Sequence, residues 1–316
     1  MPQISSEPQY GVDLVTFYHP GFWGVSTAEE MVAWCAQHPR EMWERMLDAL
    51  AEAGVPWIEL TFPPLDFRSA LAAFGSVDGV LEAFGARGVR VLSGFLNGTH
   101  WGGLSPQEAV AEVAEYAAFL RGTGAGILVL GTPMLAGGPD APVPAMTADE
   151  HRRLLGHLAG VCDAVGASLA EAGIRLAVHT ESHSVTVTAE DVRTLMALTD
   201  PELVGLCPDS AHLTLSGQDP VALAREFADR VLVSHWKDAA GPFPADLVLD
   251  EDVHAVHRRF MRPMGQGVVD WPAWAAVMAT TPTAGVRLLE LDAAPDPVAE
   301  LRAARAVAEG LAPVAG

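Results

Sequence analysis

Apolar residues in this chain occur in short runs that are apolar at every position rather than at alternate ones. Each run ends in a turn or a polar cluster and is followed by a stretch with helical character. Continuous apolar runs are typical of parallel strands that are buried on both faces. Eight such runs occur along the chain, at residues 14–18, 57–60, 89–94, 126–130, 175–179, 204–207, 231–235 and 287–291.

The stretches between these runs carry start signals of helices. Ser105, Thr147 and Thr188 each have an acidic residue three positions later, the pattern of a capping box, and Asp219 and Asp270 resemble N-caps. Eight strand–helix alternations without a long linker predict an α/β protein with one domain over residues 1–316, a (β/α)8 TIM barrel. An open doubly wound sheet is the alternative, but it would need a glycine-rich turn after the first strand.

Two connections of the predicted barrel are long. Residues 131–145 are rich in glycine and proline, and residues 239–270 carry histidines and arginines. In a barrel, both connections would leave the C-terminal ends of strands, which is the face where active sites lie. The basic and imidazole side chains of the second connection are His254, His257, Arg258, Arg259 and Arg262.

Composition narrows the choice of partners. The 316 residues, 50% of them hydrophobic, are enough for a full core without disulfide or metal staples. The net charge of −21 disfavours nucleic acid and anionic membrane surfaces as partners. Cys35, Cys162 and Cys207 contain no CxxC pair, so neither a disulfide scaffold nor a cysteine zinc site is expected. Reduced core cysteines and an N-terminus unlike a signal peptide favour the cytoplasm.

Acidic and imidazole side chains follow four successive predicted strands. His179 and Glu181 come at the end of the fifth run, Asp209 after the sixth, His235 in the seventh and Glu290 in the eighth. A barrel brings these strand ends to one mouth. Carboxylates and imidazoles without a thiolate favour one hard divalent ion with open coordination positions. Mn²⁺ is expected first, with Co²⁺, Mg²⁺, Zn²⁺ and Fe²⁺ as alternatives.

Sequence segments in the second half of the chain resemble the sugar phosphate isomerase/epimerase group of the xylose-isomerase-like barrels. The resemblance rests on the segments 209–212 (DSAH), 235–238 (HWKD) and 263–271, on Glu290, and on the 26 residues that separate Asp209 from His235. It implies that the ion is bound by Asp209, His235 and Glu290 together with a residue at the end of the fifth strand.

The fifth strand departs from the pattern of this family. The usual Glu position falls on His179, and the acidic residue comes two places later, as Glu181; a similar histidine-rich strand end occurs in the inosose dehydratase branch. Both side chains share a face if the strand continues. We assign His179 as the metal ligand and Glu181 as an acid/base group, with the converse as the alternative.

The expected chemistry is proton abstraction next to a carbonyl, with a metal-stabilised enediolate. Return of the proton gives an isomerase or epimerase acting on a keto-sugar or polyol, which is our first hypothesis. Loss of a β-substituent gives a lyase, either inosose dehydratase-like or acting on a 3-keto-glycoside, which is the second. An abasic-site endonuclease and a non-catalytic subunit are further alternatives, and the acidic charge argues against the endonuclease.

The remaining candidates surround this predicted site. Besides Glu181 and Glu290, we expect catalytic roles for His212 and Lys237, with loop packing and a salt bridge as the respective alternatives.

Because Lys and Arg are scarce near the predicted mouth, an unphosphorylated carbohydrate is the expected substrate. The resemblance also implies a homo-oligomer or pairing with a second subunit. Residues expected to contact substrate, each with ordinary packing or solvation as the alternative, are His19, Trp23, Glu59, His100, Trp101 and Arg262.

Overall fold

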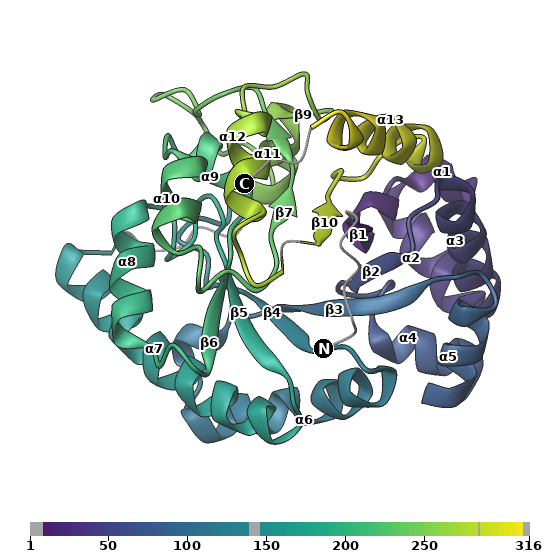
Figure 1. The fold of residues 1–316 in the computed structure, drawn as a ribbon, viewed down its shortest axis with the longest axis horizontal. Coiled ribbons are helices and arrows are strands. Elements are labelled where there is room, and N and C mark those ends of the chain that lie inside the picture. The colour runs from purple at the N-terminus through teal and green to yellow at the C-terminus, as the bar shows by residue number, and fades with distance from the viewer. Residues whose placement is uncertain (1–8, 139–145, 284, 312–316) are drawn as a thin grey trace.

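Eight parallel strands form one curled sheet with helices around it (Figure 1). The computed structural model describes residues 9–138, 146–283 and 285–311. The strand order is β6-β5-β4-β3-β2-β1-β10-β7, so the two edge strands follow each other in the chain. The predicted TIM barrel is therefore confirmed. Its strands are β1 (Gln9–Asp13), β2 (Trp57–Leu60), β3 (Arg90–Asn97), β4 (Ile127–Gly131), β5 (Arg175–His179), β6 (Val204–Cys207), β7 (His235–Trp236) and β10 (Val286–Leu289).

The barrel closes at a seam between β6 and β7. Two isolated parallel bridges join them there, Leu206 with Val231 and Asp209 with His235. The backbone N–H of Leu232 donates to the carbonyl oxygen of Leu206, and that of His235 donates to Pro208 (3.0 and 3.1 Å). The predicted strand at 231–235 is thus reduced to a bridge followed by the two residues of β7.

The first predicted strand was placed one segment too late. Residues 14–17 form the 3-10 helix η1 (Leu14–Phe17), and the strand precedes it as β1. Asp13 accepts a hydrogen bond from the backbone N–H of Val15 and so ends the strand. Leu14 and Phe17 are fully buried. An apolar run therefore fills the core from a turn, which the apolar pattern cannot distinguish from a strand.

The helices begin where their N-caps predict. Capping boxes are present at Ser105, Thr147 and Thr188, and Asp219 and Asp270 accept hydrogen bonds from the first turns of their helices. The α-helices are α1 (Pro20–Trp23), α2 (Ala28–Gln37), α3 (Pro39–Ala53), α4 (Phe67–Phe74), α5 (Val77–Gly85), α6 (Pro106–Thr123), α7 (Ala148–Glu171), α8 (Ala189–Leu198), α9 (Ser210–Leu215), α10 (Pro220–Glu226), α11 (Val253–Phe260), α12 (Trp271–Met278) and α13 (Pro297–Glu309); a short 3-10 helix, η2 (Trp101–Gly103), precedes α6.

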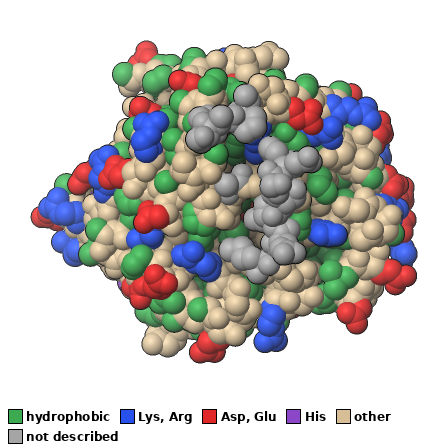
Figure 2. All heavy atoms as spheres, in the orientation of Figure 1, with side chains coloured by type: hydrophobic (Ala, Val, Ile, Leu, Met, Phe, Trp, Pro, Cys, Tyr) green, Lys and Arg blue, Asp and Glu red, His purple; other side chains and the backbone are tan. Residues whose placement is uncertain are grey.

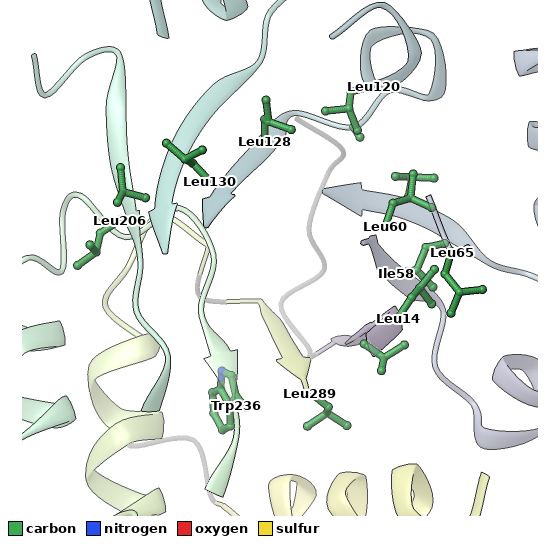
Figure 3. Close-up of a cluster of buried hydrophobic side chains, with 14 of the residues drawn as sticks. Leu14, Ile58, Leu60, Leu65, Leu120, Leu128, Leu130, Leu206, Trp236 and Leu289 are labelled. Carbon is green, nitrogen blue, oxygen red and sulfur yellow. The ribbon is translucent and has the colours of Figure 1, made fainter. Parts of the chain in front are cut away.

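The core has two layers. Side chains that alternate along each strand point either into the barrel or outward against the helices. In β4, Val129 belongs to the cluster inside the barrel. Leu128 and Leu130 belong to the cluster between the sheet and the helices and are labelled in Figure 3. Cys35, Cys162 and Cys207 are buried free thiols.

The long connection 239–270 is folded. β8 (Asp238–Ala239) pairs antiparallel with β9 (Met261–Arg262), and α11 lies between them. The Asp238 carboxylate accepts hydrogen bonds from the backbone N–H groups of Gly265 and Gly267 (2.8 and 3.0 Å) and from the Trp271 indole N–H (3.0 Å). These bonds fix the chain that follows β9 and so hold α11 in place.

The other long connection, 131–145, is described as far as residue 138. There the backbone of Gly138 lies so close to Glu251 that a Cβ atom would overlap the Glu251 carbonyl group. The two long connections therefore meet. Acidic and basic side chains are both spread over the described part of the face seen in Figure 2. Within the described ranges, no helix is both long and apolar enough to cross a membrane.

Candidate active site

A cavity of about 310 Å³ lies at the C-terminal ends of the strands. One part of its wall is aromatic and includes Tyr18, Phe62 and Phe95. The rest is polar and charged. Its ionisable lining residues come from strand ends and from the connection that carries α11: Asp13, His179, Glu181, His212, His235, Lys237, Asp252, His254, His257, Arg258, Glu290 and Asp292.

Four buried residues from four strand ends come together at this cavity. One ligand atom from each of His179, Asp209, His235 and Glu290 lies within 4.8 Å of the others. Asp209 Oδ2 is 3.7 Å from His179 Nε2 and 3.8 Å from His235 Nδ1. His235 Nδ1 in turn lies 2.7 Å from Glu290 Oε2. The structure therefore brings together the four residues predicted to bind the ion.

The same four residues carry buried polar atoms that make no hydrogen bond of acceptable geometry in the described chain: His179 Nε2, Asp209 Oδ2, His235 Nδ1 and Glu290 Oε2. The 2.7 Å contact between His235 Nδ1 and Glu290 Oε2 does not meet the angle of a hydrogen bond. Buried polar atoms are nearly always paired, and each unpaired one costs roughly 1–3 kcal/mol. Two imidazole nitrogens and two carboxylate oxygens that converge in this way are a suitable donor set for a divalent metal ion. These four residues therefore fit the divalent metal ion expected from the sequence.

Local structure explains the orientation of Asp209. It is the N-cap of α9, where its Oδ1 accepts a hydrogen bond from the backbone N–H of His212 (2.7 Å). Its own backbone N–H donates to Thr180 Oγ1 (2.9 Å). Because the cap uses one carboxylate oxygen, the other remains free to face His179 and His235.

A carboxylate behind the cluster orients His235. Glu59 Oε1 lies 2.8 Å from His235 Nε2, and Ser93 Oγ donates a hydrogen bond to Glu59 Oε2 (2.6 Å). A carboxylate acceptor places the imidazole proton on Nε2 and leaves the Nδ1 lone pair for a metal. Glu59 was predicted to contact substrate, but it is fully buried and the structure places it behind the cavity wall.

Lys237 is a buried ammonium group beside the four-residue cluster. Its Nζ donates to Glu290 Oε1 (2.6 Å) and lies 2.8 Å from Asp292 Oδ1 and 3.4 Å from His212 Nε2. Burial alone would lower the pKa of Lys237, but Asp292 and Glu290 outweigh it and hold the pKa well above its ordinary value. Burial and the neighbouring Lys237 lower the pKa of His212 well below its ordinary value, so the imidazole is neutral.

Glu181 faces the cavity from the loop after β5. Its Oε1 lies 3.2 Å from His254 Nδ1, and its Oε2 lies 4.0 Å from His179 Nδ1. Burial would raise the pKa of Glu181, but the hydrogen bond and charge of His254 outweigh it and lower the pKa to about 2. Burial would lower the pKa of His254, whereas Glu181 raises it above its ordinary value. A proton shared by this pair therefore lies on His254.

The residues predicted for catalysis, Glu181, His212, Lys237 and Glu290, all line the cavity. Those predicted to contact substrate do not. Trp23 is buried and its indole N–H donates to the Phe17 carbonyl oxygen, whereas Trp101 and His100 both contact Glu112.

The two other residues predicted to contact substrate are used locally. His19 caps α1, and Arg262 donates to the carbonyl oxygen of Arg259. Their polar groups are thus engaged outside the cavity. Arg258, from the same connection as Arg262, lines the cavity in its place.

The sequence reasoning did not assign roles to several lining residues. Asp13 ends β1, which was placed one segment too late, and Asp292 lies two residues beyond Glu290. His254 and His257 were noted as part of a long connection, but their inward faces depend on α11, which was not predicted. Phe95, in the last part of β3, follows directly after the predicted apolar run 89–94, where a phenylalanine gives no separate signal.

A family model described as xylose isomerase-like TIM barrel matches residues 47–311. The inosose dehydratase of Geobacillus kaustophilus (strain HTA426) is 38% identical over 104 residues, which cover 32% of this chain and 33% of that protein. The inosose dehydratase of Lacticaseibacillus casei is 28% identical over 186 residues, 54% of this chain and 59% of that protein. The matched segments thus span less than two thirds of these relatives.

Solved structures share the fold at low sequence identity. The IOLI protein with a binding zinc atom superposes with a TM-score of 0.67 at 14% identity, covering 96% of this chain and 97% of that one. An L-ribulose 3-epimerase gives a TM-score of 0.62 at 17% identity, with coverage of 96% and 94%.

Proposed function

Because this chain belongs to the xylose isomerase-like TIM barrel family, we propose that it is a divalent-metal-dependent lyase that removes water from a keto-inositol or a similar unphosphorylated keto-polyol. The observation that carries the proposal is the position of Lys237. Its ammonium group shares Glu290 with the four-residue cluster, so a proton donor lies beside the proposed metal site. The sequence matches to inosose dehydratases favour this lyase over the isomerase that we placed first from sequence.

His179, Asp209, His235 and Glu290 would hold the ion. A bound divalent ion supplies a Lewis acid that withdraws charge from a substrate carbonyl and makes the neighbouring C–H bond more acidic. The side chains around the cluster then have two tasks, which are to accept the carbon-bound proton and to protonate the departing hydroxyl group.

Glu181 is the proposed base. Its carboxylate accepts the proton from the carbon next to the carbonyl. Once His254 has released its own proton to water, the new proton moves to His254 through their 3.2 Å contact. The side chain of His254 is 46% exposed and can pass the proton to water. The pair therefore keeps Glu181 ionised and able to accept a proton, with an imidazole of raised pKa beside it to carry that proton away.

Lys237 is the proposed acid. As the C–H electrons form the new double bond, the C–O bond to the β-hydroxyl breaks and Lys237 Nζ gives that oxygen a proton, so that water leaves. Lys237 regains its proton from solvent, while the proton taken by Glu181 leaves through His254. No oxidant or reductant is required. Returning the proton to carbon instead would give the epimerase or isomerase outcome from the same intermediate.

The charge of the cavity supports an unphosphorylated substrate. Among the described lining residues, the Lys and Arg side chains are Lys237 and Arg258, and Lys237 already contacts two carboxylates. A phosphate would face an excess of acidic groups. Tyr18, Phe62 and Phe95 offer instead an aromatic surface for the C–H face of a polyol ring.

The test is to incubate the Mn²⁺-loaded protein with a keto-inositol in D₂O. We expect an unsaturated, dehydrated product that absorbs in the ultraviolet. Deuterium incorporation without elimination would support the isomerase or epimerase instead. Absence of both with a panel of keto-polyols, at full metal occupancy, would support the non-catalytic alternative, and a preference for phosphorylated sugars would contradict the proposed substrate class.

A further inference from the structure

Asp292 lies in the cavity wall beside the proposed acid, yet the reaction as described gives it no task. It follows β10 two residues after Glu290, and its Oδ1 is 2.8 Å from Lys237 Nζ. We propose that Asp292 is a positioning residue, which holds the Lys237 ammonium group at the leaving hydroxyl and so makes elimination, rather than return of the proton to carbon, the outcome. This inference rests on the proposed function.

The amino-acid type at position 237 is the first argument. Lys237 is the only lysine in the chain, and the other 18 of the 19 Lys and Arg residues are arginines. A guanidinium group pairs with carboxylates at least as well as an ammonium group does, but it does not release a proton in proteins. A lysine at this one buried position therefore indicates that its proton, and not its charge alone, is used.

The contacts of the ammonium group show what Asp292 adds. Lys237 Nζ also donates to Glu290 Oε1 (2.6 Å) and lies 3.4 Å from His212 Nε2. Glu290 belongs to the four-residue cluster as well, so its charge is shared with the proposed ion. Asp292 lies outside that cluster. Its carboxylate is thus free to fix the end of the flexible four-carbon side chain of Lys237.

The loop that carries Asp292 is fastened to η1. Thr16, which accepts two of the bonds involved, is fully buried. Asp292 therefore lies on a backbone that is held on both of its sides. Three backbone N–H groups of the loop donate to η1: Leu291 to Thr16 Oγ1 (3.1 Å), Ala293 to the Val15 carbonyl oxygen (3.2 Å) and Ala294 to the Thr16 carbonyl oxygen (2.9 Å).

The backbone directly after Asp292 is strained. Ala293 has a φ of 52°, a left-handed conformation that is uncommon for residues other than glycine. Such conformations persist where surrounding contacts hold them, and they cluster at active sites. Here the hydrogen bonds of Ala293 and Ala294 to η1 hold it. The loop thus keeps a less favourable backbone at the point where it presents Asp292 to Lys237.

The competing interpretation is that Asp292 only neutralises a buried charge. A neutralising partner would stabilise the fold without affecting how the intermediate divides between its two outcomes. Asp292→Ala separates the interpretations, with a keto-inositol in D₂O and the Mn²⁺-loaded protein. Elimination should fall by roughly 10²-fold, the usual effect of misplacing a group by about 1 Å. Deuterium exchange next to the carbonyl and KM should stay close to those of the native protein.

A double variant tests whether Asp292 acts through Lys237. Lys237→Met/Asp292→Ala should eliminate no more slowly than Lys237→Met alone. Asp292→Asn keeps an oxygen that can accept from Nζ and should recover part of the rate. Asp296→Ala removes the exposed N-cap of α13 and is the matched control, which should eliminate at the native rate. Native elimination by Asp292→Ala, or a parallel loss of exchange, would overturn the proposal.

The single lysine also allows a measurement without turnover. After labelling with ¹⁵N-lysine, the Zn²⁺-loaded protein gives one Nζ resonance in NMR spectra. Its protons should be protected from exchange with water in the native protein and in Asp296→Ala, and should lose that protection in Asp292→Ala. Protection that survives Asp292→Ala would overturn the proposal. Its loss in a protein that eliminates nothing would contradict the proposed function and leave Asp292 as the residue that positions Lys237.

Discussion

His235 illustrates how a single side chain is prepared by residues far away in the sequence. Its Nδ1 belongs to the four-residue cluster, while its Nε2 contacts Glu59, 176 residues earlier in the chain. Glu59 is in turn held by Ser93. The carboxylate thus sets both the tautomer and the angle of the imidazole, although it does not line the cavity.

We therefore expect Glu59→Gln to weaken metal binding by roughly 10- to 100-fold, the usual effect of losing an outer-shell partner of a ligand. The amide retains a hydrogen-bond acceptor, but it lacks the charge that strengthens the basicity of His235. Titration with Mn²⁺ measures the change. Glu112→Gln removes a carboxylate beside His100, outside the cavity, and should leave the affinity unchanged. Equal affinities in all three proteins would refute the role of Glu59.

Lys237→Met should separate the two halves of the proposed reaction. The variant keeps the length of the side chain but lacks the proton donor, so elimination should fall by about 10²- to 10⁴-fold, the usual contribution of general acid catalysis. Deuterium exchange at the carbon next to the carbonyl should fall less. Mass spectrometry of the recovered substrate measures exchange, and absorbance measures elimination. If both fall in parallel, Lys237 does not act as the acid.

Single residues also show why the ligands could be predicted and the substrate wall could not. Asp209 and Glu290 are ionisable groups in apolar strand sequence, where a charge needs a special reason. An aromatic residue in a loop is equally suitable for a cavity or a core. Trp23 and Trp101 prove to be buried, with their indole N–H groups paired to Phe17 and Glu112.

At the scale of elements, the connection after β8 determines which side chains reach the cavity. Its helix α11 places His254 and His257 in the wall, and β8 pairs with β9 around it. The sequence marked this segment as long and rich in histidine and arginine. It could not indicate a helix that depends on tertiary contacts, of which the Asp238 bonds to the following segment are one.

Gly267→Ala tests this anchoring. A Cβ atom at this position would overlap the Asp238 carboxylate and the Ala239 carbonyl oxygen. We expect a loss of about 1–3 kcal/mol in the free energy of unfolding, the usual cost of overpacking. Urea denaturation measures it. The same substitution at Gly160, exposed in α7 with nothing near its Cβ position, should instead stabilise by up to about 1 kcal/mol. A neutral Gly267→Ala would contradict the anchoring.

At the scale of the whole molecule, the barrel and its helix starts could be predicted from the sequence. The reason is that the apolar runs and the N-cap residues agree with the alternation of strands and helices along the chain. The errors lie at β1 and β7, where turns or single bridges replace regular pairing. Both occur at the mouth and seam of the barrel. At both places the backbone departs from regular strand pairing next to the cavity.

Metal binding should stabilise the whole fold, because four buried unpaired atoms gain a partner. At a free ion concentration 100 times Kd, the gain is about 2.7 kcal/mol. For a chain of this size, it raises Tm by roughly 4 °C. Thermal unfolding in EDTA and in Mn²⁺ measures the shift, which Asp209→Asn should largely abolish. A Tm that is identical in both conditions would contradict the metal site.

The seam between β6 and β7 gives the ion a mechanical role. Asp209 and His235 lie on opposite sides of the seam. A cation bound by both would therefore link the two edge strands where few backbone hydrogen bonds join them. Local opening begins at weakly tied joints. The amides of Leu232 and His235, which bond across the seam, should exchange with deuterium more slowly when the ion is bound. Binding of the ion at the candidate site would then also stabilise the closure of the barrel between β6 and β7.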